Sequence, residues 1–333
     1  MASSTIEYYD IPGFKFQDGS PATSVRLAYL DINPAATKVA LIVTCFRGRL
    51  QSTLNFSDAS LKNHRVIVAA LFGNGESSSP SNMPAKSAPG MFDYRDCVRA
   101  QHQLVTSHLG INKLDVVLGF SMGGQCTYYW TLMYPDFVKD AVIICSSART
   151  SRHNHQFLEG PKAALENSCD YEKGRPGSKR GLRAFGKAYS AWLTSAEWFE
   201  EEKYKTLGYT TLSDWDSEVA GESYYSWHPD DLLSKLRTWQ NGDVTQIFKD
   251  GDSREELSLG QALAKIQARV LLMPCQTDQY FRWEASEKEA QHIPRVSLKV
   301  IPSIWGHVAG LGSNPDDKAW MNDRISEFLE GQD

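Results

Sequence analysis

The stretch that decides the fold of this 333-residue chain is residues 114–125, which read LDVVLGFSMGGQ. An apolar strand-like run ends there in the pattern G-x-S-x-G, centred on Ser121, and a segment of helical character, residues 125–134, follows at once. Such a strand–turn–helix setting holds a serine in a strained turn and lifts its hydroxyl clear of the sheet. Glycine at 119 and 123 suits the close passage of strand and helix. The pattern predicts a nucleophilic Ser121; the alternative is an ordinary glycine-rich turn.

Composition and charge narrow the class of protein. Hydrophobic residues make up 41% and charged residues 23%, which is typical of a globular chain with a full core. A net charge of -5 gives no basic footprint for nucleic acid or an anionic membrane, and no apolar run approaches the length of a membrane span. The N-terminus lacks the pattern of a secretory signal, and the six cysteines form no C-x-x-C pair. We therefore expect a cytoplasmic protein with reduced thiols and neither nucleic-acid nor membrane partners.

Apolar runs alternate with helical patterns through the first half of the chain. Residues 5–37 predict two or three antiparallel strands at a sheet edge. Residues 38–147 then read β-α-β-α-β-α-β: the strands include 38–45 and 64–72, and the helices are 57–63, 93–109 and the one after Ser121. This order predicts an α/β fold with a mostly parallel sheet and helices on both faces.

Residues 151–245 break this rhythm. They contain no long Val/Ile run but hold five of the nine tryptophans: Trp192, Trp198, Trp215, Trp227 and Trp239. We interpret them as an inserted helical lid between core segments 1–150 and 246–333, with helices at 181–193, 196–207 and 230–239. Most of these aromatic residues would pack the lid against itself, and a few would line a substrate cavity. The core would resume with a helix at 257–266, strands at 268–274 and 296–301, and a closing helix at 316–329.

A serine nucleophile needs a base, and the base needs an acid to hold its tautomer. Asp278 follows the strand at 268–274, and His307 follows the strand at 296–301, so both should lie at the same sheet edge as Ser121. Asp278 could instead be a turn residue and His307 a structural histidine. Asp250 and Asp252 are weaker candidates for the acid because no strand precedes them.

Two backbone N–H groups should stabilise the oxyanion that forms when a carbonyl is attacked. We assign one to Met122, directly after the nucleophile, and the other to Phe46, in the loop after the strand at 38–45. His153 and His155 follow a strand end and could reach the pocket. As a metal pair they lack a third ligand, and we expect no metal.

Several further segments together resemble one branch of the α/β-hydrolases, the homoserine O-acetyltransferase-like family. They are FDYRD at 92–96, Gln101, LGI at 109–111, GFSMGG at 119–124, YPD at 134–136, ARTS at 148–151, TDQYF at 277–281 and Gly306-His307. The resemblance covers residues 38–150 and 268–310. It implies an α/β-hydrolase fold with an inserted lid, a triad of Ser121, Asp278 and His307, and a homodimer through the lid.

The chain departs from that family in two places. Transferases of the family follow the catalytic histidine with an acidic residue that holds the amino group of homoserine, and here that place is Val308. The loop after the strand at 38–45 is also different, with Thr44-Cys45-Phe46-Arg47-Gly48 in place of a histidine and a Thr-Gly pair. An aromatic lid suggests a larger, less polar substrate. Arg149, His153, His155 and Val308 are our candidates for substrate binding.

Three functions follow from these residues. The first is a serine hydrolase that cleaves a small-molecule ester, thioester or similarly activated acyl group without a cofactor. The second is an acyltransferase that uses acyl-CoA as co-substrate and an alcohol other than homoserine as acceptor. The third is a non-catalytic binding protein on a hydrolase scaffold.

Overall fold

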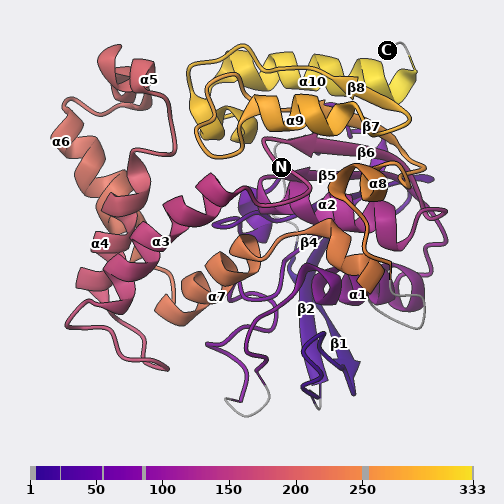
Figure 1. The fold of residues 1–333 in the computed structure, drawn as a ribbon, viewed down its shortest axis with the longest axis horizontal. Coiled ribbons are helices and arrows are strands. Elements are labelled where there is room, and N and C mark those ends of the chain that lie inside the picture. The colour runs from indigo at the N-terminus through magenta and orange to yellow at the C-terminus, as the bar shows by residue number, and fades with distance from the viewer. Residues whose placement is uncertain (1–4, 23, 55, 85–87, 250–254, 332–333) are drawn as a thin grey trace.

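A computed structural model describes residues 5–331 apart from 23, 55, 85–87 and 250–254. Eight strands of the described residues form one sheet in the order β1-β2-β4-β3-β5-β6-β7-β8 (Figure 1). The strands are β1 (Glu7–Pro12), β2 (Ser24–Ile32), β3 (Lys38–Val43), β4 (His64–Ala69), β5 (Leu114–Phe120), β6 (Val138–Ile144), β7 (Arg269–Met273) and β8 (Val296–Leu298). The pairs β1–β2 and β2–β4 are antiparallel and all others are parallel. The predicted α/β fold with a mostly parallel sheet is confirmed.

The two faces of the sheet carry two separate hydrophobic clusters. Successive strand side chains point to opposite faces, so Leu41 belongs to one cluster and Ile42 to the other. The first face packs against α1 (Tyr94–Gln103) and α2 (Met122–Met133). The second face packs against α10 (Pro315–Glu330). Burial on both faces explains why the central strands are continuous aliphatic runs.

The chain between β6 and β7 is mostly helical. It contains α3 (Arg152–Glu166), α4 (Lys179–Ser190), α5 (Ala196–Glu200), α6 (Leu212–Trp215) and α7 (Pro229–Gln240), followed by α8 (Leu259–Leu263). In Figure 1, α4, α5 and α6 stand to the left of the sheet, while α7 lies nearer the strands. The division of the chain at residues 150 and 245 stays a prediction, and we keep the name lid for residues 151–245.

Some predicted elements differ from those in the structure. Residues 57–63 form turns rather than a helix, because four of the seven are Ser, Asp or Asn, whose side chains compete for backbone hydrogen bonds. The helix expected over 93–109 is α1 followed by a wider π-helical turn at Leu104–His108. Neither α3 nor α9 (Trp283–Ala290) was predicted from the sequence. Asp250 and Asp252 lie outside the described residues.

None of the helices in the described ranges combines the length and the apolar character that crossing a bilayer requires.

Candidate active site

Ser121 occupies the tight turn between β5 and α2. Its φ of 58° and ψ of -123° lie in a region that side chains other than glycine rarely adopt. The Ser121 N–H donates to the Ile144 carbonyl at 2.9 Å, and its carbonyl accepts from the Gln125 N–H at 3.0 Å and from the Ser146 hydroxyl at 2.7 Å. These bonds hold the strained turn in place, as expected at a functional residue.

The two glycines of the turn are there because strand and helix nearly touch. A Cβ at Gly119 would lie 2.1 Å from the Gly123 carbonyl oxygen, and a Cβ at Gly123 would lie 2.4 Å from the Val43 carbonyl oxygen. Both distances are far below any normal contact, and in each case the neighbour is backbone, which cannot move aside. The turn therefore requires glycine at both positions.

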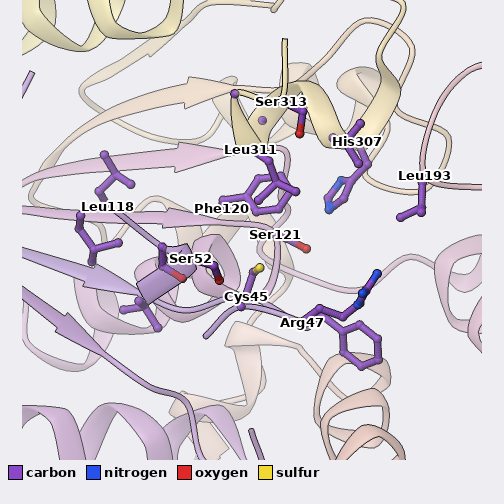
Figure 2. A pocket seen from close by; sticks show the side chains of 18 of the residues that line it. Cys45, Arg47, Ser52, Leu118, Phe120, Ser121, Leu193, His307, Leu311 and Ser313 are labelled. Carbon is purple, nitrogen blue, oxygen red and sulfur yellow. The ribbon is translucent and has the colours of Figure 1, made fainter. Parts of the chain in front are cut away.

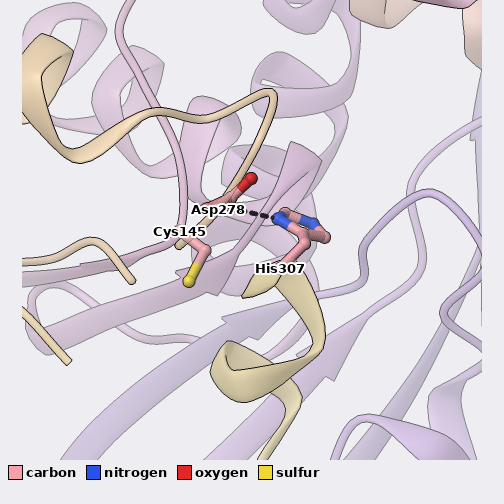
Figure 3. Close-up of side chains that lie close together, drawn as sticks. All are labelled: Cys145, Asp278 and His307. Carbon is pink, nitrogen blue, oxygen red and sulfur yellow. Dashed lines mark hydrogen bonds and ion pairs between the residues drawn. The ribbon is translucent and has the colours of Figure 1, made fainter. Parts of the chain in front are cut away.

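His307 and Asp278 form a hydrogen-bonded pair at the same edge of the sheet (Figure 3). His307 Nδ1 lies 2.6 Å from Asp278 Oδ2, and both residues are buried. The other carboxylate oxygen accepts the N–H groups of Tyr280 at 3.1 Å and Phe281 at 3.0 Å. The carboxylate is therefore fixed in orientation, and it places the Nδ1 proton so that Nε2 is the free nitrogen of a neutral imidazole.

Ser121 and His307 line one cavity of about 510 Å³. Figure 2 shows the serine hydroxyl and the imidazole facing the same space, with Cys45 and Arg47 on its opposite wall. Most of the lining is apolar, from side chains such as Phe120, Leu193 and Leu311. The structure thus brings together a nucleophile and an oriented base in one mostly apolar cavity.

The two backbone N–H groups expected to bind the oxyanion are those of Phe46, which lines this cavity, and of Met122, which directly follows Ser121 in the chain. Phe46 is in the loop after β3, and Met122 is the first residue of α2, where the helix dipole favours negative charge. Within the described part of the chain, neither N–H donates to another protein group. The Phe46 ring stacks on Tyr189 of the lid, with ring centres 5.8 Å apart. These N–H groups can serve as the two donors of an oxyanion hole.

The structure places the four candidates for substrate binding in different surroundings. Val308 lines the cavity, whereas Arg149, His153 and His155 do not. Arg149 Nε pairs with Asp243 Oδ2 at 3.0 Å, and His153 packs against Trp192. The three residues were expected in the pocket because they follow β6, but α3 begins at Arg152 and carries His153 and His155 away.

Other residues of the cavity were not predicted. They are chiefly Tyr189 and Leu193 of the lid, Tyr280, Arg47 and the segment 310–313. None of the five lid tryptophans lines the cavity; Trp198 and Trp215, for example, pack against each other with ring centres 5.4 Å apart. The aromatic composition of the lid indicated that some lid side chains line the cavity, but it could not separate the residues that line the cavity from those that pack within the lid.

One group of three potential metal ligands occurs among the described residues: Cys145, Asp278 and His307, with donor atoms within 4.8 Å of one another (Figure 3). Burial raises the pKa of the Cys145 thiol well above its ordinary value, so the thiol stays protonated and is a poor ligand. Asp278 and His307 are bonded to each other through the atoms that a metal would use. The donor set fits a hydrogen-bonded pair better than a metal site.

The fold and this site together define an α/β-hydrolase. A family model described as "alpha/beta hydrolase fold" matches residues 42–172. The "Ethyl acetate hydrolase" of Pseudomonas veronii is 33% identical over 271 residues, which cover 79% of this chain and 76% of that protein. The chain therefore belongs to the α/β-hydrolase family.

Two further comparisons define the branch. A "Homoserine O-acetyltransferase" of Cyclobacterium marinum is 26% identical over 259 residues, covering 74% of this chain and 71% of that protein. The solved structure of "the acetyl esterase MekB" superposes with a TM-score of 0.90 at 28% identity, covering 98% of this chain and 97% of that one. The resemblance predicted from the sequence is confirmed, and because the relatives are esterases and acyltransferases, the chain is an enzyme of this fold.

Proposed function

We propose that this enzyme is a serine hydrolase that cleaves an ester, thioester or similarly activated acyl substrate through an acyl-enzyme on Ser121. The observation that carries the proposal is the 2.6 Å bond between His307 Nδ1 and Asp278 Oδ2, beside the cavity into which Ser121 faces. The names of two relatives, an ethyl acetate hydrolase and an acetyl esterase, support the same reaction type.

The mechanism follows from this geometry. His307 Nε2 takes the proton of the Ser121 hydroxyl while its oxygen attacks the substrate carbonyl carbon. The resulting oxyanion accepts hydrogen bonds from the N–H groups of Phe46 and Met122. His307 then gives the proton to the leaving alcohol or thiol, and the acyl group stays on Ser121. A water molecule activated by His307 releases the acid, and Asp278 stabilises the imidazolium that forms at each step.

The cavity wall indicates the kind of substrate. Its apolar lining favours an acyl group without charge, and the proposed substrate is a small molecule. Val308 faces the cavity where a homoserine acyltransferase would need an acid, so a free amino acid acceptor is disfavoured. We further propose a cytoplasmic location, which the six unpaired cysteines support, no nucleic-acid or membrane partner, in keeping with the net charge of -5, and a homodimer through the lid.

The test of the proposal is labelling by a serine-directed phosphonate, compared between wild type and Ser121→Ala. We expect stable labelling of the wild type and none of the variant, with both proteins shown to be folded by circular dichroism. Absence of Ser121-dependent labelling in folded protein would remove the proposed acyl-enzyme and leave the binding-protein function.

Acyl transfer is the second candidate because homoserine O-acetyltransferases are among the relatives. The same residues would form the acyl-enzyme from acyl-CoA, and an alcohol in place of water would accept the acyl group. Release of free CoA that requires an added alcohol would favour transfer. Turnover of a simple ester without any acceptor would favour hydrolysis.

A further inference from the structure

A lysine of the lid is buried against the loop that carries Phe46. Lys235 lies on α7 and is fully buried, and its Nζ donates to the Cys45 carbonyl oxygen at 2.5 Å. The Cys45 carbonyl and the Phe46 N–H belong to the same peptide group. We infer that Lys235 is a positioning residue for catalysis, which orients and polarises this peptide so that the Phe46 N–H can stabilise the oxyanion. The inference rests on the proposed function.

The geometry of the peptide group links the Cys45 carbonyl oxygen to the Phe46 N–H. In a trans peptide the C=O and N–H bonds point in opposite directions, so a group that fixes the oxygen also fixes the direction of the N–H. The Cys45 oxygen is held twice, by Lys235 Nζ and by the Gly48 N–H at 3.2 Å. Phe46 lines the cavity together with Cys45 and Ser121, and Figure 2 shows the last two around the same space.

The charge of the lysine adds to this effect. A cation bonded to a carbonyl oxygen withdraws electron density from the amide, and hydrogen bonds in such a chain strengthen one another. The ammonium also attracts the negative charge that develops on the other side of the peptide, through a medium of low dielectric constant. Both effects are larger in the transition state than in the bound substrate, as catalysis requires.

A purely structural role accounts poorly for a lysine at this position. Burying an ammonium costs several kcal/mol, and an apolar side chain of the same length would fill the space without that cost. Burial lowers the pKa of Lys235 to about 8, so the group is still mainly protonated at neutral pH. The other titratable groups around it are Cys45, Cys97, Arg49 and Glu76.

The lid is also attached to the core without Lys235. Thr238, one turn further along α7, donates its hydroxyl to the Phe92 carbonyl at 2.6 Å. Asp231, one turn earlier, accepts the Ser81 N–H at 2.9 Å and the Ser81 hydroxyl at 2.7 Å. Thr238 is therefore a matched control: it makes a buried bond from the same helix to the core, but not to the loop of Phe46.

The experiment compares Lys235→Met with Thr238→Val. Each variant is assayed for kcat and KM with a neutral ester, and for the inhibition constant of a trifluoromethyl ketone, which forms a tetrahedral oxyanion on the serine. For Lys235→Met we expect kcat to fall about 10- to 100-fold and the inhibition constant to rise by a similar factor, as when one oxyanion donor is weakened, while KM changes less than about twofold. For Thr238→Val we expect both to stay within about threefold of wild type.

Two results would overturn the inference. The first is an unchanged ketone affinity in folded Lys235→Met. The second is an equal loss of kcat and ketone affinity in both variants, which would mean that these contacts only attach α7 to the core. If Lys235→Met does not fold, Lys235→Gln, which keeps a neutral donor on a shorter chain, is judged by the same criterion. Phosphonate labelling of the wild type is measured first. If the wild type is not labelled, the proposed function is wrong. If the wild type is labelled but Lys235→Met keeps its ketone affinity, only this inference is wrong.

Discussion

The imidazole of His307 is held by one hydrogen bond and by three aromatic rings. Asp278 fixes Nδ1, and the rings of Phe120, Tyr280 and Phe281 pack around the imidazole with centre distances of 4.6, 4.3 and 5.6 Å. Such packing limits rotation of the ring, so that Nε2 keeps its direction without reorganisation during the reaction. At the scale of residues, the proposed chemistry therefore depends on one imidazole whose orientation is set by the residues around it.

Replacing this imidazole tests its role. We expect His307→Ala to lower ester turnover at least about 100-fold while the fold is kept, because general-base catalysis alone typically supplies that much. Turnover is measured by release of the alcohol, and the fold by circular dichroism. His292→Ala, at an exposed histidine outside the cavity, is the control and should leave turnover unchanged. A mild effect of His307→Ala would place the base elsewhere.

Glu289 on α9 is a second buried ionisable residue, and its ionisation affects the stability of the fold, not the proposed reaction. It accepts the Tyr128 hydroxyl at 2.6 Å and the Ala148 N–H at 2.9 Å. Burial raises the pKa of its carboxyl from 4.5 to about 7. The folded state thus holds the proton more tightly than the unfolded state, so the contribution of Glu289 to stability is full below pH 4.5 and is lost as the pH rises through about 7.

Glu289→Gln should remove this pH dependence. The amide cannot ionise; its oxygen can accept the Ala148 N–H, and its NH2 group can donate to the Tyr128 hydroxyl oxygen. We therefore expect the free energy of unfolding at about pH 8 to rise by up to about 3 kcal/mol. Urea unfolding of both proteins across the pH range measures this, and the two curves should converge toward pH 4.5. If the variant is no more stable than the wild type at about pH 8, the buried carboxylate does not destabilise the folded protein at that pH.

At the scale of elements, the turn between β5 and α2 leaves no room for a side chain at either of its two glycines. Its geometry follows from local sequence, since glycine at 119 and 123 permits the approach and an aliphatic strand precedes it. Its position at the carboxyl end of the sheet follows from the parallel pairing of β5 with β3 and β6. The turn at Ser121 and the sheet could therefore be predicted from the sequence.

A pair of glycine substitutions tests that statement. Gly119→Ala should destabilise the protein by more than about 3 kcal/mol or prevent folding, because its Cβ would meet backbone atoms. Gly160→Ala is the matched control: this glycine lies on α3, and apart from its own helix and chain neighbours nothing lies within 4 Å of the added Cβ. The helix propensity of alanine is offset there by the ring of Pro161, which follows directly, so we expect a change in stability of less than about 1 kcal/mol. Thermal or urea unfolding measures both. Equal effects of the two changes would contradict the steric argument.

At the scale of the whole molecule, the lid supplies part of the cavity wall through Tyr189, Leu193 and Val219, and it also carries exposed apolar side chains. Leu207 is 43% exposed and Leu212 is 45% exposed, and both belong to the lid. The proposed homodimer would cover them, since apolar side chains of that size stabilise an interface when they leave water.

We expect sedimentation velocity at micromolar concentration to show a dimer, and Leu207→Asp combined with Leu212→Asp to convert it to a monomer. Tyr8→Asp is the control, because Tyr8 is 51% exposed on β1, away from the lid, and should leave the dimer intact. A wild-type monomer under these conditions would rule out the proposed dimer.

The sequence by itself determined the sheet, the strained serine and the family, because strand periodicity, glycine placement and short motifs are local properties of the chain. It also led to Asp278 and His307 as candidates, since each follows a strand. The π-helical turn at 104–108 and the turns at 57–63 were not predicted, because small differences in energy between alternative hydrogen bonds determine the backbone conformation of such segments.

Only the tertiary structure decided which residues border the cavity. Arg149 and Val308 were both candidates for substrate binding from the sequence. In the structure, Arg149 pairs with Asp243 and lies outside the cavity, whereas a short helical turn brings Val308 into its lining. Lys235 and the Cys45 carbonyl lie 190 positions apart in the chain. Their contact depends on how the lid packs on the core, and no local pattern encodes the free energy of that packing.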